Sequence, residues 1–162
     1  MITLDKINID ILTEMEEDAR ISLHELSRRL GYPVSTIRDR IQKMEEEGII
    51  LGYKTILDHK KLGYGIKAIV QIFYQQTIPH QKSLSEVGKF PEVSSIQFVT
   101  GEMDEQITVY ARDVDHLREI LFTKFGEISF PVRQNTIIVL HEQTFPFSRN
   151  FQKPQEIERS GD

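Results

Sequence analysis

The sequence predicts an α+β protein in two parts, a helical N-terminal part and a C-terminal part that alternates strands with helices. Two observations support this prediction. Between residues 4 and 47, apolar residues recur at three- and four-residue spacing, which is typical of amphipathic helices. From residue 66 onwards, runs rich in β-branched and aromatic residues alternate with helical stretches, which is typical of strands packed against helices.

The first two elements are helices, over residues 4–15 and 22–30. The second begins with a capping box, in which the Ser22 side chain accepts from the amide of Glu25 while Glu25 reaches back to Ser22. Each segment has one apolar side, formed by Leu4, Ile7, Ile11, Leu12 and Met15 in the first and by Leu23, Leu26 and Leu30 in the second.

A third helix is predicted over residues 34–47, after an interruption at Gly31 and Pro33. Its apolar stripe consists of Ile37, Ile41 and Met44. Two helices joined by a short turn that contains glycine form a helix-turn-helix, in which the second helix enters the major groove by its N-terminal part. The same spacing also occurs in plain helical bundles, whose polar face is solvated.

The polar side of this third helix has residue types that contact phosphates and base edges. Ser35, Thr36 and Arg38 are expected nearest the bases. Since the net charge is −5, binding to DNA requires a local basic patch, which a dimer would double. The candidates for the patch are Arg28, Arg29, Arg38, Arg40, Lys43 and Lys54, while Glu14, Glu16, Glu17, Asp18 and Glu45 to Glu47 are expected to face away from DNA.

Residues 49–56 are expected to form a short strand pair, because Gly48 ends the third helix and bulky residues follow. This favours a winged helix-turn-helix domain over residues 1–57. Charge and glycine then mark a linker over residues 58–65. Residues 143–162 form a C-terminal tail, with Phe145, Phe147 and Phe151, whose first part is expected to pack on a neighbouring subunit and whose end is expected to be disordered.

Residues 66–142 predict a ferredoxin-like βαββαβ domain, an antiparallel sheet with two helices on one face. The strands are expected over residues 66–74, 93–100, 106–111 and 132–140, and the helices over residues 80–89 and 114–124. Both faces of the strands are substantially apolar, so the face without helices needs a cover. We expect a homodimer that pairs two sheets and presents two recognition helices to DNA half-sites.

In this order and spacing, the segments resemble the Lrp/AsnC family of bacterial and archaeal transcription regulators, also called feast/famine regulatory proteins. The resemblance covers nearly the whole chain, and runs through LDKINIDIL, DARIS, LSRRLGYPVSTIRDRIQKMEEEGII, GYKTILDHKKLGY, FPEV, VTGEMDEQITVYARD and NTIIVL. It implies dimers formed through the C-terminal domain, often assembled into octamers, and an amino-acid effector bound between neighbouring dimers.

Two departures from the family pattern concern the DNA site. Relatives often place Ser-Pro at the start of the recognition helix, whereas this chain has Pro33-Val34, so Ser35 or the Tyr32 backbone is expected to replace the serine cap. Asp39 stands where relatives often carry a basic or neutral polar residue. It either accepts from a cytosine amino group or pairs with Lys43 one turn on, and we favour the pairing with Lys43.

The resemblance also implies an effector site at residues 100–105, which correspond to the Gly-x-x-Asp hairpin of the family. Gly101 lets the backbone approach a small ligand, and Asp104 receives its ammonium group or organises the loop. Met103 replaces a frequent aromatic residue, and Thr136 aligns with a polar position near the pocket. The alternative is a tight acidic turn that binds nothing.

An enzyme is the less favoured interpretation, although siroheme decarboxylases resemble this architecture and use histidine near a tetrapyrrole. The histidines show no metal-ligand spacing, and neither a Ser/His/Asp set nor a phosphate-binding glycine loop is present, so we expect no cofactor or metal. His116 is expected to face solvent, and His141 is the one candidate to test.

The composition predicts a cytoplasmic protein without a membrane partner, because the sequence has no cysteine, signal peptide or membrane-spanning apolar run. The expected function is a sequence-specific DNA-binding transcription regulator, modulated by an amino acid or related small metabolite. The alternatives are an effector-independent architectural protein that binds DNA and a siroheme-decarboxylase-like enzyme.

Overall fold

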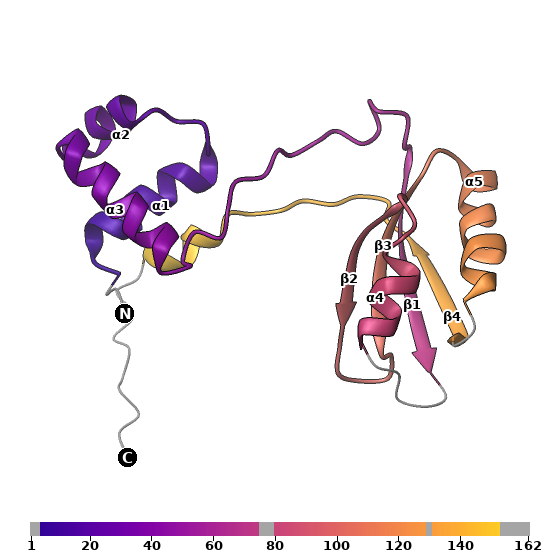
Figure 1. Ribbon diagram of the computed structural model, residues 1–162. Helices are drawn as coiled ribbons and strands as arrows, with labels where there is room; N and C mark the ends of the chain where they lie inside the picture. Colours follow the sequence, from indigo (N-terminus) through magenta and orange to yellow (C-terminus); the bar gives the residue numbers. More distant parts are fainter. Residues whose placement is uncertain (1–3, 75–79, 129–130, 153–162) are drawn as a thin grey trace, which may run out of the picture. The chain divides into compact units, whose positions relative to one another are not determined.

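The computed structural model describes residues 4–74, 80–128 and 131–152, which form two compact units (Figure 1). The first unit joins the described residues of Met1–Thr55 and Gln143–Asp162, and the second consists of those of Ile56–Glu142. No helix within the described ranges is both long and apolar enough to cross a bilayer.

The first unit contains the three expected helices, α1 (Lys6–Glu17), α2 (Leu23–Leu30) and α3 (Val34–Glu46). Asp5 caps α1 by accepting from the Asn8 amide at 3.0 Å, so Leu4 lies before the helix rather than in it. Half of the expected capping box of α2 is present: Ser22 Oγ accepts from the Glu25 amide at 3.1 Å, but the Glu25 carboxylate pairs with Arg28 and Arg29 instead of reaching back to Ser22. Sequence patterning therefore located the helices to within about a turn.

A small apolar core holds these helices together. It includes contacts from Ile49 and Ile50, the residues that were expected to start a wing. Ile11, Leu26, Ile37 and Met44 are fully buried, and Ile49 and Ile50 pack against them.

The predicted strand pair over residues 49–56 is absent from this part of the structure. Gly48, at φ 70°, turns the chain, and the amides of Ile49 and Ile50 donate to the Met44 carbonyl at 2.8 and 3.1 Å. Because these amides continue the end of α3, the chain cannot begin a strand ladder at this point.

The C-terminal segment makes a contact within the chain. A short 3₁₀ helix, η3 (Phe147–Gln152), packs on α1, and the expected contact with a neighbouring subunit stays a prediction. The expected disorder concerns residues that lie outside the described ranges.

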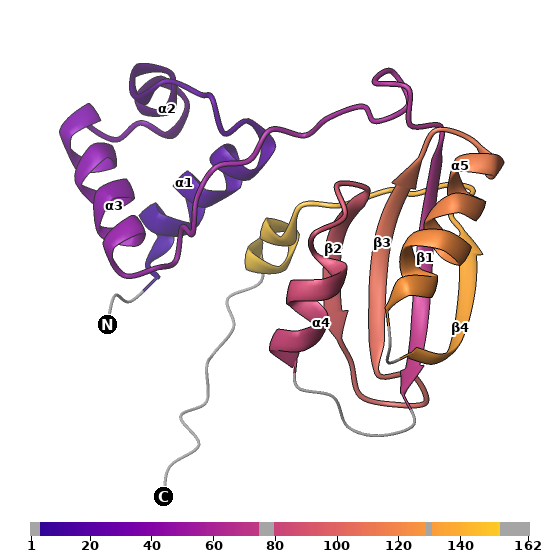
Figure 2. The same ribbon diagram turned by 45° about the vertical axis from the view of Figure 1, so that its right-hand side comes forward.

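The second unit has the predicted order: β1 (Ile66–Tyr74), α4 (His80–Val87), β2 (Val93–Phe98), β3 (Glu105–Ala111), α5 (Val114–Glu119) and β4 (Pro131–Ile138). Its antiparallel strands lie in the order β2-β3-β1-β4. Figure 2 shows α4 and α5 on the same face of the sheet. The expected helix over residues 114–124 is shorter, because the chain widens into a π turn at Ile120–Lys124 and then tightens into a 3₁₀ turn at Phe125–Glu127.

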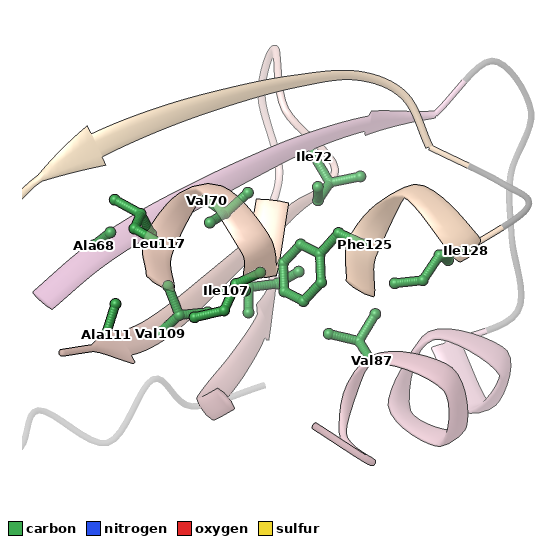
Figure 3. Close-up of a cluster of buried hydrophobic side chains, with 11 residues drawn as sticks. Ala68, Val70, Ile72, Val87, Ile107, Val109, Ala111, Leu117, Phe125 and Ile128 are labelled. Carbon is green, nitrogen blue, oxygen red and sulfur yellow. The ribbon is translucent and has the colours of Figure 1, made fainter. Parts of the chain in front are cut away.

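The core of this unit lies between the sheet and the helices (Figure 3). Ala68, Val70 and Ile72 of β1 alternate with residues on the other face, and they are buried beside Ile107 and Val109 of β3. This alternation is what a sheet with one covered face requires.

The open face of the sheet is more polar than the sequence suggested. Ile69, Phe73 and Ile137 are its apolar residues, and the register places Lys67 and Gln71 between them. Most of the other side chains that the register places on this face are polar or charged, including Ser95, Gln97, Gln106, Thr108, Tyr110, Arg133 and Asn135. Sequence patterning missed this, because β1 and the end of β4 carry apolar residues on both faces, whereas β2 and β3 place polar residues on the open face.

Candidate DNA-binding and effector sites

Helix α3 has a buried side and a solvent side. Ile37 and Met44 point into the helical core, while Ser35 and Arg38 are exposed and Thr36 is half-buried. Pro33, at the N-cap, makes no side-chain hydrogen bond, and neither of the expected substitutes caps the helix through a side chain. The Tyr32 carbonyl instead accepts from Ser27 Oγ at 2.6 Å, which fixes the turn between α2 and α3.

Arg28 and Arg29 at the end of α2 are not free cations. Arg28 lies 2.5 Å from Glu25, and Arg29 lies 2.8 Å from both Glu25 and Glu14. Hydrogen bonds from Arg28 and Arg29 hold the pKa of Glu25 at about 2. Glu14, which was expected to face away from DNA, therefore lies beside one of the candidate DNA contacts. A phosphate must compete with these carboxylates for both guanidinium groups.

Arg40 connects α3 to α1. Its Nη1 lies 2.7 Å from Asp5 Oδ2 and 3.4 Å from Oδ1 of the buried Asn8. The Asn8 backbone N–H and the Arg40 guanidinium lower the pKa of Asp5. Arg40 thus positions α3 against the cap of α1, whatever further contact it makes with DNA.

Arg38, Lys43 and Lys54 are exposed and make no ion pair within the part of the chain that the structure describes. In particular, the expected pair between Asp39 and Lys43 does not form. Lys54 follows α3 and lines a pocket beside α1. The cations on α3 that are free to meet a phosphate are therefore Arg38 and Lys43.

The candidate effector hairpin is tied to the end of β1. Asp104 Oδ2 accepts from the Tyr74 amide at 2.8 Å, and the Asp104 amide donates to the Ile72 carbonyl at 3.1 Å. Gly101 is exposed at φ 129°, a conformation that favours glycine, and Met103 is half-buried. Asp104 therefore organises the loop, which is one of its two expected roles.

Thr136 lies apart from this hairpin. It lies within β4, opposite Val70. Strand β1 separates β4 from β3, which carries the hairpin. The structure thus brings Gly101, Met103 and Asp104 together and leaves Thr136 on the far side of β1.

Sequence reasoning missed a buried carboxylate next to the hairpin. Glu105 is fully buried and accepts from Ser83 Oγ at 2.7 and 2.8 Å and from the Tyr74 hydroxyl. Burial and the neighbouring carboxylate raise the pKa of the Tyr74 phenol. The signal was present in the strand period, because Glu105 shares the face of Ile107 and Val109.

His116 is buried, so the expectation that it faces solvent is wrong. Its Nδ1 accepts from the Arg112 amide at 3.1 Å, and its Nε2 lies 3.3 Å from Glu92 Oε1. Lys124 Nζ is 2.6 Å from the same oxygen. Asp113 caps α5 by accepting from the His116 amide at 2.7 Å. The described residues include no group of three or more acidic or histidine side chains that could hold a metal ion.

Comparison with known proteins assigns the chain to a family. A family model described as winged helix-turn-helix DNA-binding matches residues 4–50, and one described as Lrp/AsnC ligand binding domain matches residues 67–145. An uncharacterized HTH-type transcriptional regulator of Pyrococcus horikoshii is 31% identical over 150 residues, which cover 93% of this chain and 94% of that relative. The chain belongs to the Lrp/AsnC family of transcription regulators.

Other members of the Lrp/AsnC family agree in sequence and in fold. The regulatory protein AsnC of Haemophilus influenzae is 30% identical over 138 residues, covering 85% of this chain and 92% of that protein. A transcriptional regulator of Neisseria meningitidis, solved in complex with L-Met, matches with a TM-score of 0.83 at 25% identity, covering 90% of this chain and 96% of that one. Escherichia coli AsnC matches with a TM-score of 0.80 at 27% identity, covering 89% and 97%. The chain is a DNA-binding transcription regulator with a ligand-binding domain.

Proposed function

We propose that this regulator recognises a specific DNA sequence through α3 and that an amino acid or related small metabolite changes its affinity for that sequence. The observation that carries the proposal is the exposed side of α3, where Ser35 and Arg38 stand opposite the buried Ile37 and Met44. A helix held by one face and polar on the other is suited to enter a major groove.

Base contacts and phosphate contacts fall to different residues in this proposal. Ser35, Thr36 and Arg38 read bases, because they lie in the first turns of α3. Lys43 and Lys54 contact phosphate. The three arginines with carboxylate partners contact phosphate only when they release those partners; they are Arg28, Arg29 and Arg40. The regulator acts as a cytoplasmic dimer or octamer without catalytic activity.

The effector binds at the hairpin of Gly101, Met103 and Asp104, and Thr136, which lies on the far side of β1 from the hairpin, is left out of this site. Support for an amino acid comes from the Neisseria relative, whose structure was solved with L-Met. Asp104 can accept an ammonium group with the carboxylate oxygen that the Tyr74 amide does not occupy. A neighbouring subunit would complete the site, as the family resemblance implies.

One observation favours a second candidate, a DNA-binding protein without an effector. The hairpin is already closed by the bonds between Asp104 and β1, so it needs no ligand to hold its shape. The two candidates bind DNA alike and differ only in their response to small molecules.

Selection of genomic DNA fragments on the purified protein, with and without a pool of amino acids at fixed salt, tests both candidates. Enriched palindromic sites that change with the pool support the effector-tuned regulator. Enriched sites that are the same with and without the amino acids support the effector-free candidate. If no DNA site is enriched, sequence-specific binding is refuted.

A further inference from the structure

The end of α1 makes a specific contact with the C-terminal segment of the chain. Both carboxylate oxygens of Glu16 accept backbone hydrogen bonds, from the amides of Phe147 and Ser148, each at 2.6 Å. Ser148 is 3% exposed, so the first turn of η3 is packed closely against α1. Hydrogen bonds to an ionised carboxylate are among the stronger ones in proteins.

The same contact closes one side of a pocket of about 420 Å³ within the first unit. Three segments line it: α1 through Leu12 and Met15, the chain after α3 through Ile50 and Tyr53, and η3 through Phe147. The two segments that lead to and from the second unit, around residues 49–54 and 147, therefore meet on α1.

We propose that Phe147–Gln152 is a clasp that holds α1 and thereby sets the affinity of the first unit for DNA. The clasp makes the chain after β4 a second connection to the DNA-binding helices, in addition to the chain after α3. The clasp acts on the position of α3 through α1. Glu16 lies at the C-terminal end of α1, and Asp5, which pairs with Arg40 of α3, caps its N-terminal end. The DNA-binding part of this proposal rests on the proposed function, whereas the docking part does not.

The charge of Glu16 is essential to the clasp. Burial alone would raise its pKa, but the amides of Ser148 and Phe147 lower the pKa below its ordinary value. Glu17, the next residue, is exposed and makes no contact of this kind within the described chain. Glu17→Gln therefore removes the same charge from the same helix end without touching the clasp.

The first test is amide hydrogen exchange on the full chain, comparing Glu16→Gln, Glu16→Ala and Glu17→Gln with the wild type. Both Glu16 variants should exchange about tenfold faster at Phe147 and Ser148, as expected for loss of a charge-assisted hydrogen bond, and Glu17→Gln should not. Equal exchange in all four proteins overturns the proposal.

The second test is operator affinity in the same proteins. Loss of a negative charge near DNA favours binding in every variant, so Glu17→Gln should bind DNA as well as the wild type or better. Loosening of α1 opposes this, and the Glu16 variants should bind about threefold to tenfold more weakly. Glu16 variants that bind as Glu17→Gln does show a clasp without effect on DNA, and overturn the proposal.

Truncation separates the clasp from the residues beyond it. A chain ending at Gln152 should match the wild type in exchange and affinity, while a chain ending at Glu142 should behave as the Glu16 variants do. A synthetic peptide of residues 143–152 should restore protection of α1 in the chain that ends at Glu142, and should fail when that chain also carries Glu16→Gln. If the wild type binds no specific DNA, the proposed function fails, and amide exchange at Phe147 and Ser148 still decides whether the clasp docks.

Discussion

At the scale of single residues, the candidate DNA-binding cations divide into two groups. Arg28, Arg29 and Arg40 are held by carboxylates of the same unit, while Arg38 and Lys43 are free of ion pairs in the described chain. Charge alone made these residues look equivalent in the sequence. Their partners make Arg40 a residue that positions α3 and leave Arg38 as the strongest candidate for reading bases.

Substitution of the two arginines should separate these roles. Arg38→Ala should relax sequence preference, with a loss of about 1–3 kcal/mol of discrimination at one base pair. Arg40→Ala should weaken binding to all sequences, lower the salt slope and also lower the melting temperature of the first unit, because Asp5 loses its partner. Titration of operator and scrambled DNA at several salt concentrations measures the first three effects. A wild-type melting temperature for Arg40→Ala would contradict the positioning role.

Asp104 has two possible duties, and two substitutions distinguish them. Asp104→Asn keeps an oxygen for the Tyr74 amide but lacks the charge, whereas Asp104→Ala lacks both. If Asp104 receives an ammonium group, both variants should lose the response of DNA binding to amino acids while remaining dimeric. Calorimetric titration with the active amino acid provides the measurement. A responsive Asp104→Asn variant would assign the residue to loop structure alone.

At the scale of elements, the sequence predicted most of the fold because helices and strands have strong local signals. The bounds of β1 and the Ser22 N-cap of α2 agree with the structure, since alternation and an N-cap depend on neighbouring residues only. The wing was not predictable in this way, because Ile49 and Ile50 suit a strand but are bonded to the end of α3. The burial of Glu105 and His116 likewise depends on partners distant in sequence.

The ion pair between Glu92 and Lys124 of the π turn offers a test of how stability depends on pH. Burial opposes ionisation of Glu92, but the Lys124 ammonium lowers the pKa of Glu92 below its ordinary value of 4.5. A lowered pKa in the folded state means that Glu92 stabilises the second unit above pH 4.5 and that this contribution is lost as the pH falls through the lowered value. Thermal unfolding from pH 6 to pH 3 should therefore show Glu92→Gln less stable than wild type at pH 6, with the difference shrinking at low pH. A difference that is constant across this range would exclude the carboxylate as its cause.

At the scale of the whole molecule, the open face of the sheet is expected to form the dimer. Ile69 and Ile137 are paired across β1 and β4, and Ile137 remains 45% exposed in the single chain. Polar contacts surround this apolar pair, among them Gln71 with Asn135 at 2.8 Å. An apolar centre with a hydrogen-bonded surround is the usual composition of a protein interface.

A charge placed in this apolar pair should dissociate the dimer, because Ile137→Lys would bury an ammonium group without a partner. Sedimentation should show the dimer dissociation constant raised by more than about tenfold, and operator binding should become steeply dependent on protein concentration. Ser95→Lys is the matched control, since Ser95 is exposed on the same face but on β2, at the edge of the sheet opposite β4. It adds the same charge away from the apolar pair and should change dimerisation much less. Equal dissociation of the two variants would mean that net charge rather than the Ile69–Ile137 contact governs assembly, and a stable Ile137→Lys dimer would place the interface elsewhere.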